Sequence, residues 1–169
     1  MDSLPAQFFR TARLRFRPFE TRDLEDIFRL ASDPAVIRHM GDGRPLDRET
    51  TALWIERSRA NVAAHGYGTG ALTLTEEDRL IGWAGFARPE GEPEELVYAL
   101  DPALWGRGLG REALDGLVAF GFERLGLAEL RAQTYPENIV SQNMLRRAGF
   151  EEQPPPAEDV RLFVLRPSR

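Results

Sequence analysis

The chain has no cysteine, no lysine and only two histidines, His39 and His65, among its 169 residues. Without cysteine it can form neither a disulfide nor a thiolate zinc site, and it has no thiol nucleophile. Two histidines are too few for a histidine-rich metal site, so we expect no bound metal. All 22 basic residues are arginine, which leaves the N-terminus as the only primary amine.

Long apolar runs and an excess of positive charge are also missing. No stretch approaches the roughly 18 consecutive apolar residues of a membrane span, and the first residues lack the basic start and apolar core of a secretory signal. We therefore expect a cytoplasmic protein that binds no membrane. A net charge of −5 argues against nucleic-acid binding, which uses a basic surface. The length fits a single domain over residues 1–169, with a core of about 11–166.

Hydrophobic periodicity divides the chain into strands and helices. Alternating polar and apolar residues predict strands at 13–19, 69–75, 79–87, 94–100, 129–134 and 160–165. Apolar residues three or four apart predict helices at 22–31, 48–64 and 138–148, a short helix after Asp33-Pro34, and a long one between the glycine-rich turn and Gly126. This order indicates a mixed α/β layer fold.

The most informative stretch is the glycine-rich turn Leu104–Ala113, Leu-Trp-Gly-Arg-Gly-Leu-Gly-Arg-Glu-Ala. Glycine adopts backbone angles that other residues avoid and lets a ligand approach the backbone closely. The start of a helix adds unpaired N–H donors and about half a positive charge. The turn therefore predicts a site for the pyrophosphate of a nucleotide-like cofactor.

Two familiar phosphate-binding motifs do not fit this turn. A dinucleotide-binding turn has the spacing G-x-G-x-x-G near the start of a βαβ unit, whereas these glycines alternate as G-x-G-x-G. A Walker loop requires Gly-Lys-Ser/Thr, and the chain has no lysine.

A third interpretation covers more of the chain. The order of elements resembles the GNAT superfamily of acetyl-CoA-dependent N-acetyltransferases, whose cofactor motif is Q/R-x-x-G-x-G/A. The stretch Trp105–Gly110 matches except that Trp105 stands at the first position, and this Trp-Gly-Arg-Gly turn resembles the branch of ribosomal-protein N-terminal (RimJ/RimL-like) acetyltransferases. The further segments that resemble this branch are Thr11–Pro18, Ala31–Pro34, and Pro136–Ser141 with Arg147–Phe150.

The resemblance implies a central mixed, mostly antiparallel sheet with helices on both faces. It also implies that the strands at 94–100 and 129–134 splay apart and hold CoA between them. Backbone N–H groups from Arg107 to Arg111, through Gly108, Leu109 and Gly110, are expected to cradle the pyrophosphate. The edge at Ala99 and Leu100 is expected to bond the pantetheine arm, and Asn138 and Ser141 to face the cofactor. Arg107 and Arg111 could equally be solvated surface residues, and we expect Trp105 to pack beneath the turn.

Acetyl transfer requires an unprotonated amine. An α-amine has a pKa of about 8, so roughly a tenth is neutral at pH 7. The pKa of a lysine amine, about 10.4, lies about 3.4 units above pH 7, or roughly 4.6 kcal/mol. An α-amine therefore needs only modest help from a general base. Our candidate base is Glu95, although strand alternation places Glu94 and Glu95 on opposite faces, so one of them is surface.

The general acid is harder to assign. Many members of the resembling family use a tyrosine four residues before the Gly-Phe pair, and here that position is Leu145. Ser141 or Asn138 is the candidate donor to the departing thiolate. Tyr98 is expected to be a core aromatic, and His39, beside the flexible loop 41–45, either lines the acceptor site or is a surface group.

The sequence thus predicts transfer of an acetyl group from acetyl-CoA to a primary amine, on a protein N-terminus or a small molecule, directly within a ternary complex. The alternative is a catalytically silent CoA-binding sensor or partner module of the same fold. The final strand could also pair with a second copy as a homodimer.

Overall fold

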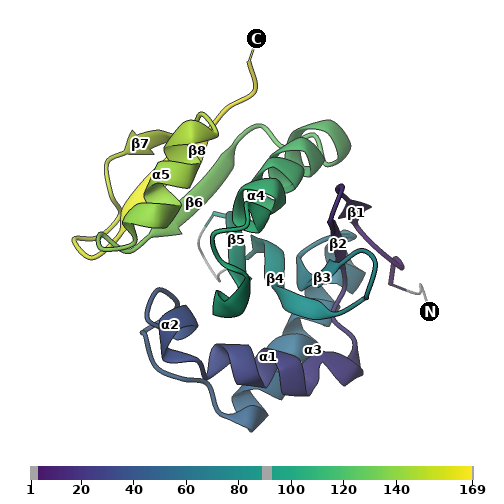
Figure 1. Ribbon diagram of the computed structural model, residues 1–169. Coiled ribbons are helices and arrows are strands. Elements are labelled where there is room, and N and C mark those ends of the chain that lie inside the picture. The colour runs from purple at the N-terminus through teal and green to yellow at the C-terminus, as the bar shows by residue number, and fades with distance from the viewer. Residues whose placement is uncertain (1–3, 89–92, 169) are drawn as a thin grey trace.

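The computed structural model describes residues 4–88 and 93–168, which form two antiparallel sheets and the helices packed against them (Figure 1). The strands are β1 (Phe9–Arg10), β2 (Leu14–Arg17), β3 (Thr69–Leu74), β4 (Leu80–Ala87), β5 (Glu95–Leu100), β6 (Leu130–Thr134), β7 (Glu151–Gln153) and β8 (Arg161–Leu165). The α-helices are α1 (Leu24–Ala31), α2 (Pro34–Ile37), α3 (Arg48–His65), α4 (Leu109–Ala119) and α5 (Ile139–Arg147). Short 3-10 turns are η1 (Thr21–Asp23) and η2 (Pro102–Leu104), and a π-helical turn, η3 (Phe120–Arg124), extends α4.

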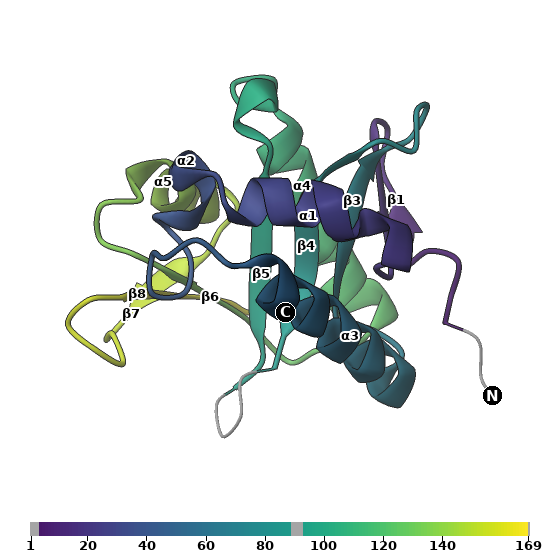
Figure 2. The same ribbon diagram turned by 90° about the horizontal axis from the view of Figure 1, so that it is seen from below.

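The larger sheet has the order β1-β2-β3-β4-β5, with all neighbours antiparallel. Helices cover both of its faces: α4 lies on one, and α1 and α3 lie on the other (Figure 2). Each face buries its own apolar cluster. Leu96 and Leu100 of β5 join Leu114 of α4 in the first cluster, and Trp83 of β4 joins Ile27 of α1 in the second.

The smaller sheet has the order β6-β8-β7 and is covered by α5. Strand β6 lies beside β5, the edge of the larger sheet. Across the described residues, the ladders join strands within each sheet and none joins β5 to β6. The two strands are therefore splayed, and backbone groups along the facing edge of β5 are directed into the gap.

The expected α/β fold with a mostly antiparallel sheet, helices on both faces and a splayed strand pair is confirmed. Periodicity missed β1 and β7, which have two and three residues, too few for an alternating pattern to be distinguished from a loop. The long helix begins at Leu109, inside the glycine stretch, because Gly108 at φ 76° forms its N-cap. The loop expected between the predicted strands at 79–87 and 94–100 lies mostly outside the described residues. Among the described residues, no helix is long and apolar enough to cross a membrane.

Candidate active site

The glycine-rich turn places the first peptide groups of α4 at the end of β5. Gly106 and Gly108 adopt φ values of 77° and 76°, in the left-handed region that strains other residues. Leu109 then begins the helix and is 4% exposed. The backbone N–H groups of the first turn of α4 are therefore presented at the protein surface, where they can bind an anion.

A set of contacts from the N-terminal segment anchors this turn. Glu112 accepts hydrogen bonds from the Thr11 hydroxyl at 2.6 Å and from Arg13 Nε at 2.7 Å. Arg13 Nη1 in turn donates to the carbonyl oxygen of Arg107 at 2.9 Å. Burial alone would raise the pKa of Glu112, but the bonds from Thr11 and Arg13 outweigh it and lower that pKa. Glu112 is therefore charged at neutral pH, and the contacts join the turn to the segment before β2.

The expectation that Trp105 packs beneath the turn is wrong. Its side chain is 48% exposed, because Leu104 and Leu109, at 7% and 4% exposure, fill the space under the turn. The indole Nε1 instead donates to the carbonyl oxygen of Leu100 at 3.0 Å. Trp105 thus closes the end of β5 and lines the cleft beside the turn.

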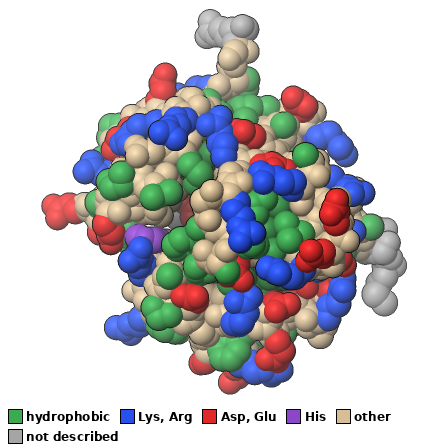
Figure 3. Space-filling view, viewed as in Figure 1, with side chains coloured by type: hydrophobic (Ala, Val, Ile, Leu, Met, Phe, Trp, Pro, Cys, Tyr) green, Lys and Arg blue, Asp and Glu red, His purple; other side chains and the backbone are tan. Residues whose placement is uncertain are grey.

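The turn forms one wall of a cleft of about 450 Å³ between α2, α4 and α5. Figure 3 shows the surface hollowed here, with arginine side chains gathered beside the hollow. Predicted cofactor residues that line it are Ala99, Leu100, Gly108, Leu109, Gly110, Arg111, Asn138 and Ser141. The lining does not include Arg107, which is solvent-exposed. Arg38 and Arg147, which sequence reasoning did not single out, line the cleft as well and give it a positive charge.

The backbone of β5 determines which groups face the gap. Gly82 and Leu100 are cross-strand partners, and the Asp101 N–H bonds the Ile81 carbonyl at 2.7 Å. In an antiparallel ladder, this pattern makes Leu100 a non-hydrogen-bonded position, so its N–H and C=O point away from β4. Tyr98 has the same orientation, whereas Ala99 is directed toward Trp83. The backbone of Leu100 is therefore free to bond a ligand in the gap, whereas the backbone groups of Ala99 are directed to β4. Both residues line the cleft.

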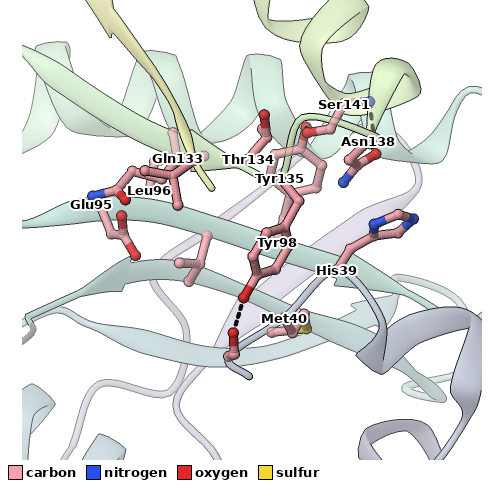
Figure 4. Close-up of a pocket in the computed structure, with 13 residues that line it drawn as sticks. His39, Met40, Glu95, Leu96, Tyr98, Gln133, Thr134, Tyr135, Asn138 and Ser141 are labelled. Carbon is pink, nitrogen blue, oxygen red and sulfur yellow. Dashed lines mark hydrogen bonds between the residues drawn. The ribbon is translucent and has the colours of Figure 1, made fainter. Parts of the chain in front are cut away.

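A second cavity, of about 350 Å³, adjoins the cleft and is lined by separate segments of the chain (Figure 4). Its lining is His39, Met40, Gly41, Glu95, Leu96, Val97, Tyr98, Gln133, Thr134, Tyr135, Asn138, Ser141 and Val160. Glu95 is the one carboxylate in this lining. Glu94 instead pairs with Arg88 Nε at 2.9 Å and accepts from the Tyr67 hydroxyl at 3.0 Å. Of the two neighbouring carboxylates, Glu95 is therefore the one that meets this cavity.

Ser141, Asn138 and Tyr98 lie where the two cavities meet, and all three line both. The Asn138 side chain accepts from the Ser141 N–H at 3.3 Å and caps α5. The hydroxyls of Tyr98 and Ser141 are 3.0 Å apart, so Tyr98 is part of the site as well as of the core. Burial raises the pKa of Tyr98, partly offset by the bond to Ser141, and keeps its hydroxyl protonated. Leu145, at the position of the missing tyrosine, is fully buried.

The loop after α2 borders the second cavity through Met40 and Gly41. The Tyr135 hydroxyl donates to the carbonyl oxygen of Gly41, which joins this loop to the end of β6. Burial raises the pKa of Tyr135, and the nearby carboxylates Asp159, Asp42 and Glu137 raise it further. Three carboxylates therefore lie near Tyr135 at the edge of the second cavity, one of them, Asp42, 3.7 Å from Arg44 Nε.

Sequence reasoning found the residues of the glycine turn and of α5 but missed Met40, Thr134 and Val160. These lie far apart in the chain and belong to no motif. The one available signal was the position of His39 beside the glycine-rich loop, and the structure places His39 in the lining of both cavities. The described residues contain no group of three His, Cys, Asp or Glu side chains that could hold a metal ion.

Comparison with known proteins relates this geometry to a family. The family profile described as the acetyltransferase (GNAT) domain matches residues 13–151. The chain is 28% identical over 149 residues to FsC-acetyl coenzyme A-N(2)-transacetylase of Aspergillus fumigatus, which covers 83% of the chain. The chain spans 63% of the length of that relative.

Solved structures share the whole architecture. The acetyltransferase from Agrobacterium tumefaciens is 26% identical with a TM-score of 0.84, covering 99% of this chain and 97% of that one. RimL, a ribosomal-protein alpha-N-acetyltransferase solved with coenzyme A, is 16% identical with a TM-score of 0.76, covering 96% and 97%. The likeness to RimL shows a common fold.

Proposed function

The chain belongs to the GNAT acetyltransferase family, and from this premise we propose that it moves the acetyl group of acetyl-CoA onto a primary amine by direct transfer in a ternary complex. The amine would belong to a protein N-terminus or to a small molecule. The observation that carries the proposal is the junction of two cavities at β5, one basic and bordered by a helix start, the other bordered by Glu95. Each cavity suits one of the two substrates.

The residues of the cleft fit the phosphates of acetyl-CoA. Backbone N–H groups from Gly108 to Arg111 would bond the pyrophosphate, because the left-handed glycines leave them accessible. Arg38, Arg111 and Arg147 add positive charge along the same cleft. The outward-facing backbone of Leu100 and Tyr98 would bond the pantetheine arm, and an N–H of this edge would stabilise the oxyanion of the tetrahedral intermediate.

On the acceptor side, Glu95 would remove a proton from the attacking amine, directly or through water. A carboxylate is a weak base, but an α-amine near pKa 8 needs only modest help at neutral pH. The carboxylates near Tyr135, Asp42, Glu137 and Asp159, would attract the ammonium form of the acceptor. This charge pattern favours a cationic acceptor.

The departing thiolate would take a proton from Ser141 or water, with Asn138 holding the start of α5 in place. The Tyr98 hydroxyl, 3.0 Å from Ser141 Oγ, would hold the serine in position and stay protonated itself. This arrangement supplies a donor where the chain lacks the tyrosine that many relatives use.

The test is a thiol-release assay with acetyl-CoA and a panel of amines, including α-amino amides, short peptides and polyamines. Release of CoA that depends on one of these amines supports the proposal. A thermal shift with CoA but no thiol release with any amine would favour the alternative, a silent CoA-binding module. Absence of both signals would contradict a CoA site altogether.

A further inference from the structure

His39 lies at the junction of the two cavities although no motif contains it. It follows α2, which ends at Ile37, and it lines both the cleft and the acceptor cavity. In Figure 4 its ring extends toward the side of the site where Asn138 lies. A side chain shared by both linings can reach the point where the acetyl group passes between the substrates.

The hydrogen bonds of the ring define which nitrogen carries the proton. Arg38 Nε donates to His39 Nε2 at 3.0 Å, so Nε2 uses its lone pair as an acceptor. In a neutral imidazole, the proton is then on Nδ1. His39 Nδ1 is buried and meets no hydrogen-bond partner among the residues that the structure describes.

The surroundings keep this ring neutral. Burial is the main cause of a lowered His39 pKa, and the Arg38 guanidinium lowers it further, while Glu137 acts in the opposite direction. Neutral His39 with an occupied Nε2 is a donor through Nδ1 and cannot serve as a base at the same time. This separates its role from that of Glu95.

We propose that Arg38 fixes His39 as the Nδ1–H tautomer and that this N–H donates a hydrogen bond to a substrate carbonyl oxygen at the junction of the two cavities. The inference rests on the proposed function for the identity of the substrates. The oxygen belongs either to the acetyl thioester or to a carbonyl next to the acceptor amine. In both cases the proton stays on Nδ1. A bond to the thioester oxygen would also strengthen as negative charge develops on that oxygen.

The chain offers a direct spectroscopic test because it has only two histidines. His65→Ala leaves His39 as the single imidazole, and long-range ¹H–¹⁵N correlation at pH 7.5 then reports its tautomer in the ligand-free protein. We expect the Nδ1–H form in this variant and a shift toward the Nε2–H form when Arg38→Met is added. An imidazolium or an Nε2–H tautomer before that change would overturn the proposal.

Titrations then identify the oxygen. If the chemical shift of His39 Nδ1 changes with acetyl-CoA but not with CoA, the bonded oxygen belongs to the thioester. If it changes with alaninamide alone, the oxygen belongs to the acceptor. No change with any of these three probes would overturn the inference. If acetyl-CoA perturbs His39 while no amine releases thiol, the inference stands and the proposed transfer fails, so the two failures are distinguishable.

Kinetics provide an independent readout. Asn places an amide N–H near the position of Nδ1, whereas Gln places it near Nε2. We expect His39→Gln to lower turnover by about 10- to 100-fold, up to the lower limit of about 100-fold for one oxyanion donor, and His39→Asn to recover most of it. His65→Ala is the matched control and should leave turnover unchanged. Equal loss in the Asn and Gln variants would contradict a donor at Nδ1.

Discussion

The two cavities on either side of β5 are built in different ways. The cleft beside the glycine-rich turn is centred on that turn and the start of α4, although residues of α2, β5 and α5 also line it. We propose that the backbone N–H groups at this helix start are its anion-binding groups. The acceptor cavity has no such centre. It is formed by side chains from the loop after α2, from β5, from the end of β6 and from the segment before β8.

This difference means that the two cavities should respond differently to substitution. A cradle of backbone N–H groups depends on a few glycines, Gly106 and Gly108 among them. A pocket of side chains changes with each substitution in its lining. The arginines that line the cleft, Arg38, Arg111 and Arg147, also contrast with Glu95 in the lining of the second cavity.

The largest expected effect comes from breaking the backbone cradle. Gly108→Glu forces a residue with a side chain into a φ of 76° and places a carboxylate beside the bound pyrophosphate. Like charges in contact cost several kcal/mol, so we expect CoA affinity to fall at least about 100-fold, or roughly 2.7 kcal/mol. Isothermal titration calorimetry with CoA measures this.

Gly126→Glu is the matched control for that variant. Gly126 has a φ of 65° and no atom within 4 Å of an added Cβ, so the backbone strain is similar but the cofactor is far away. Comparable loss of CoA affinity in both variants would mean that strain, and not the cradle, is responsible.

The acceptor side should respond to a different change. Glu95→Gln should lower kcat/KM for the amine by about 10- to 100-fold, since general bases contribute at least this much, and should leave CoA affinity unchanged. The loss should be greater at pH 6.5 than at pH 9, because a scarcer neutral amine depends more on the base. Glu94→Gln, which alters the ion pair with Arg88, is the control. A loss that is equal at every pH would indicate that Glu95 positions the acceptor.

A smaller effect is expected at the boundary between the cavities. Tyr98→Phe removes the hydroxyl that bonds Ser141, and we expect kcat to fall about 3- to 10-fold, the value of one net hydrogen bond. The double variant with Ser141→Ala should be no slower than Ser141→Ala alone, because the two groups act together. Additive losses in steady-state kinetics would show that Tyr98 acts independently.

The smallest effect concerns the anchor of the glycine turn. The lowered pKa of Glu112 means that its charged form stabilises the fold above its unfolded pKa of about 4.3. That contribution is lost as the pH falls through the folded pKa. Glu112→Gln should therefore lower Tm by about 2–4 °C at pH 7, and the difference from the unaltered protein should shrink below pH 4 in differential scanning calorimetry. A constant difference across this range would exclude the charge as the cause.

Much of the fold could be predicted because its signals are local. Alternation predicted the long strands, and the helix predicted at 48–64 corresponds to α3, which Gly66 ends at φ 81°. The glycine-rich turn was predictable for the same reason, because its glycines and the helix that follows lie within one stretch of sequence. The position of Trp105 was not, because it depends on Leu104 and Leu109 filling the space beneath the turn.

The lining of the second cavity could not be predicted from the sequence beyond His39, Glu95, Asn138 and Ser141. Tyr135 meets Gly41 only because β6 and the loop after α2 are brought together in the folded protein. Similarly, Tyr98 reaches Ser141 across the gap between β5 and α5. Contacts between residues 43 or 94 positions apart leave no periodic pattern in the chain.

The splay of β5 from β6 also makes it possible to detect a ligand in the gap from the exchange of backbone amides. The amides of Tyr98 and Leu100 point into the gap and not toward β4, so their exchange with deuterium should be slowed by whatever bonds them there. A pantetheine arm in the gap would protect these amides, and the amides of Ala99 and Trp83, already in the ladder, would change little. Exchange at these four positions would therefore distinguish a ligand that enters the gap from one that only rests on the glycine turn.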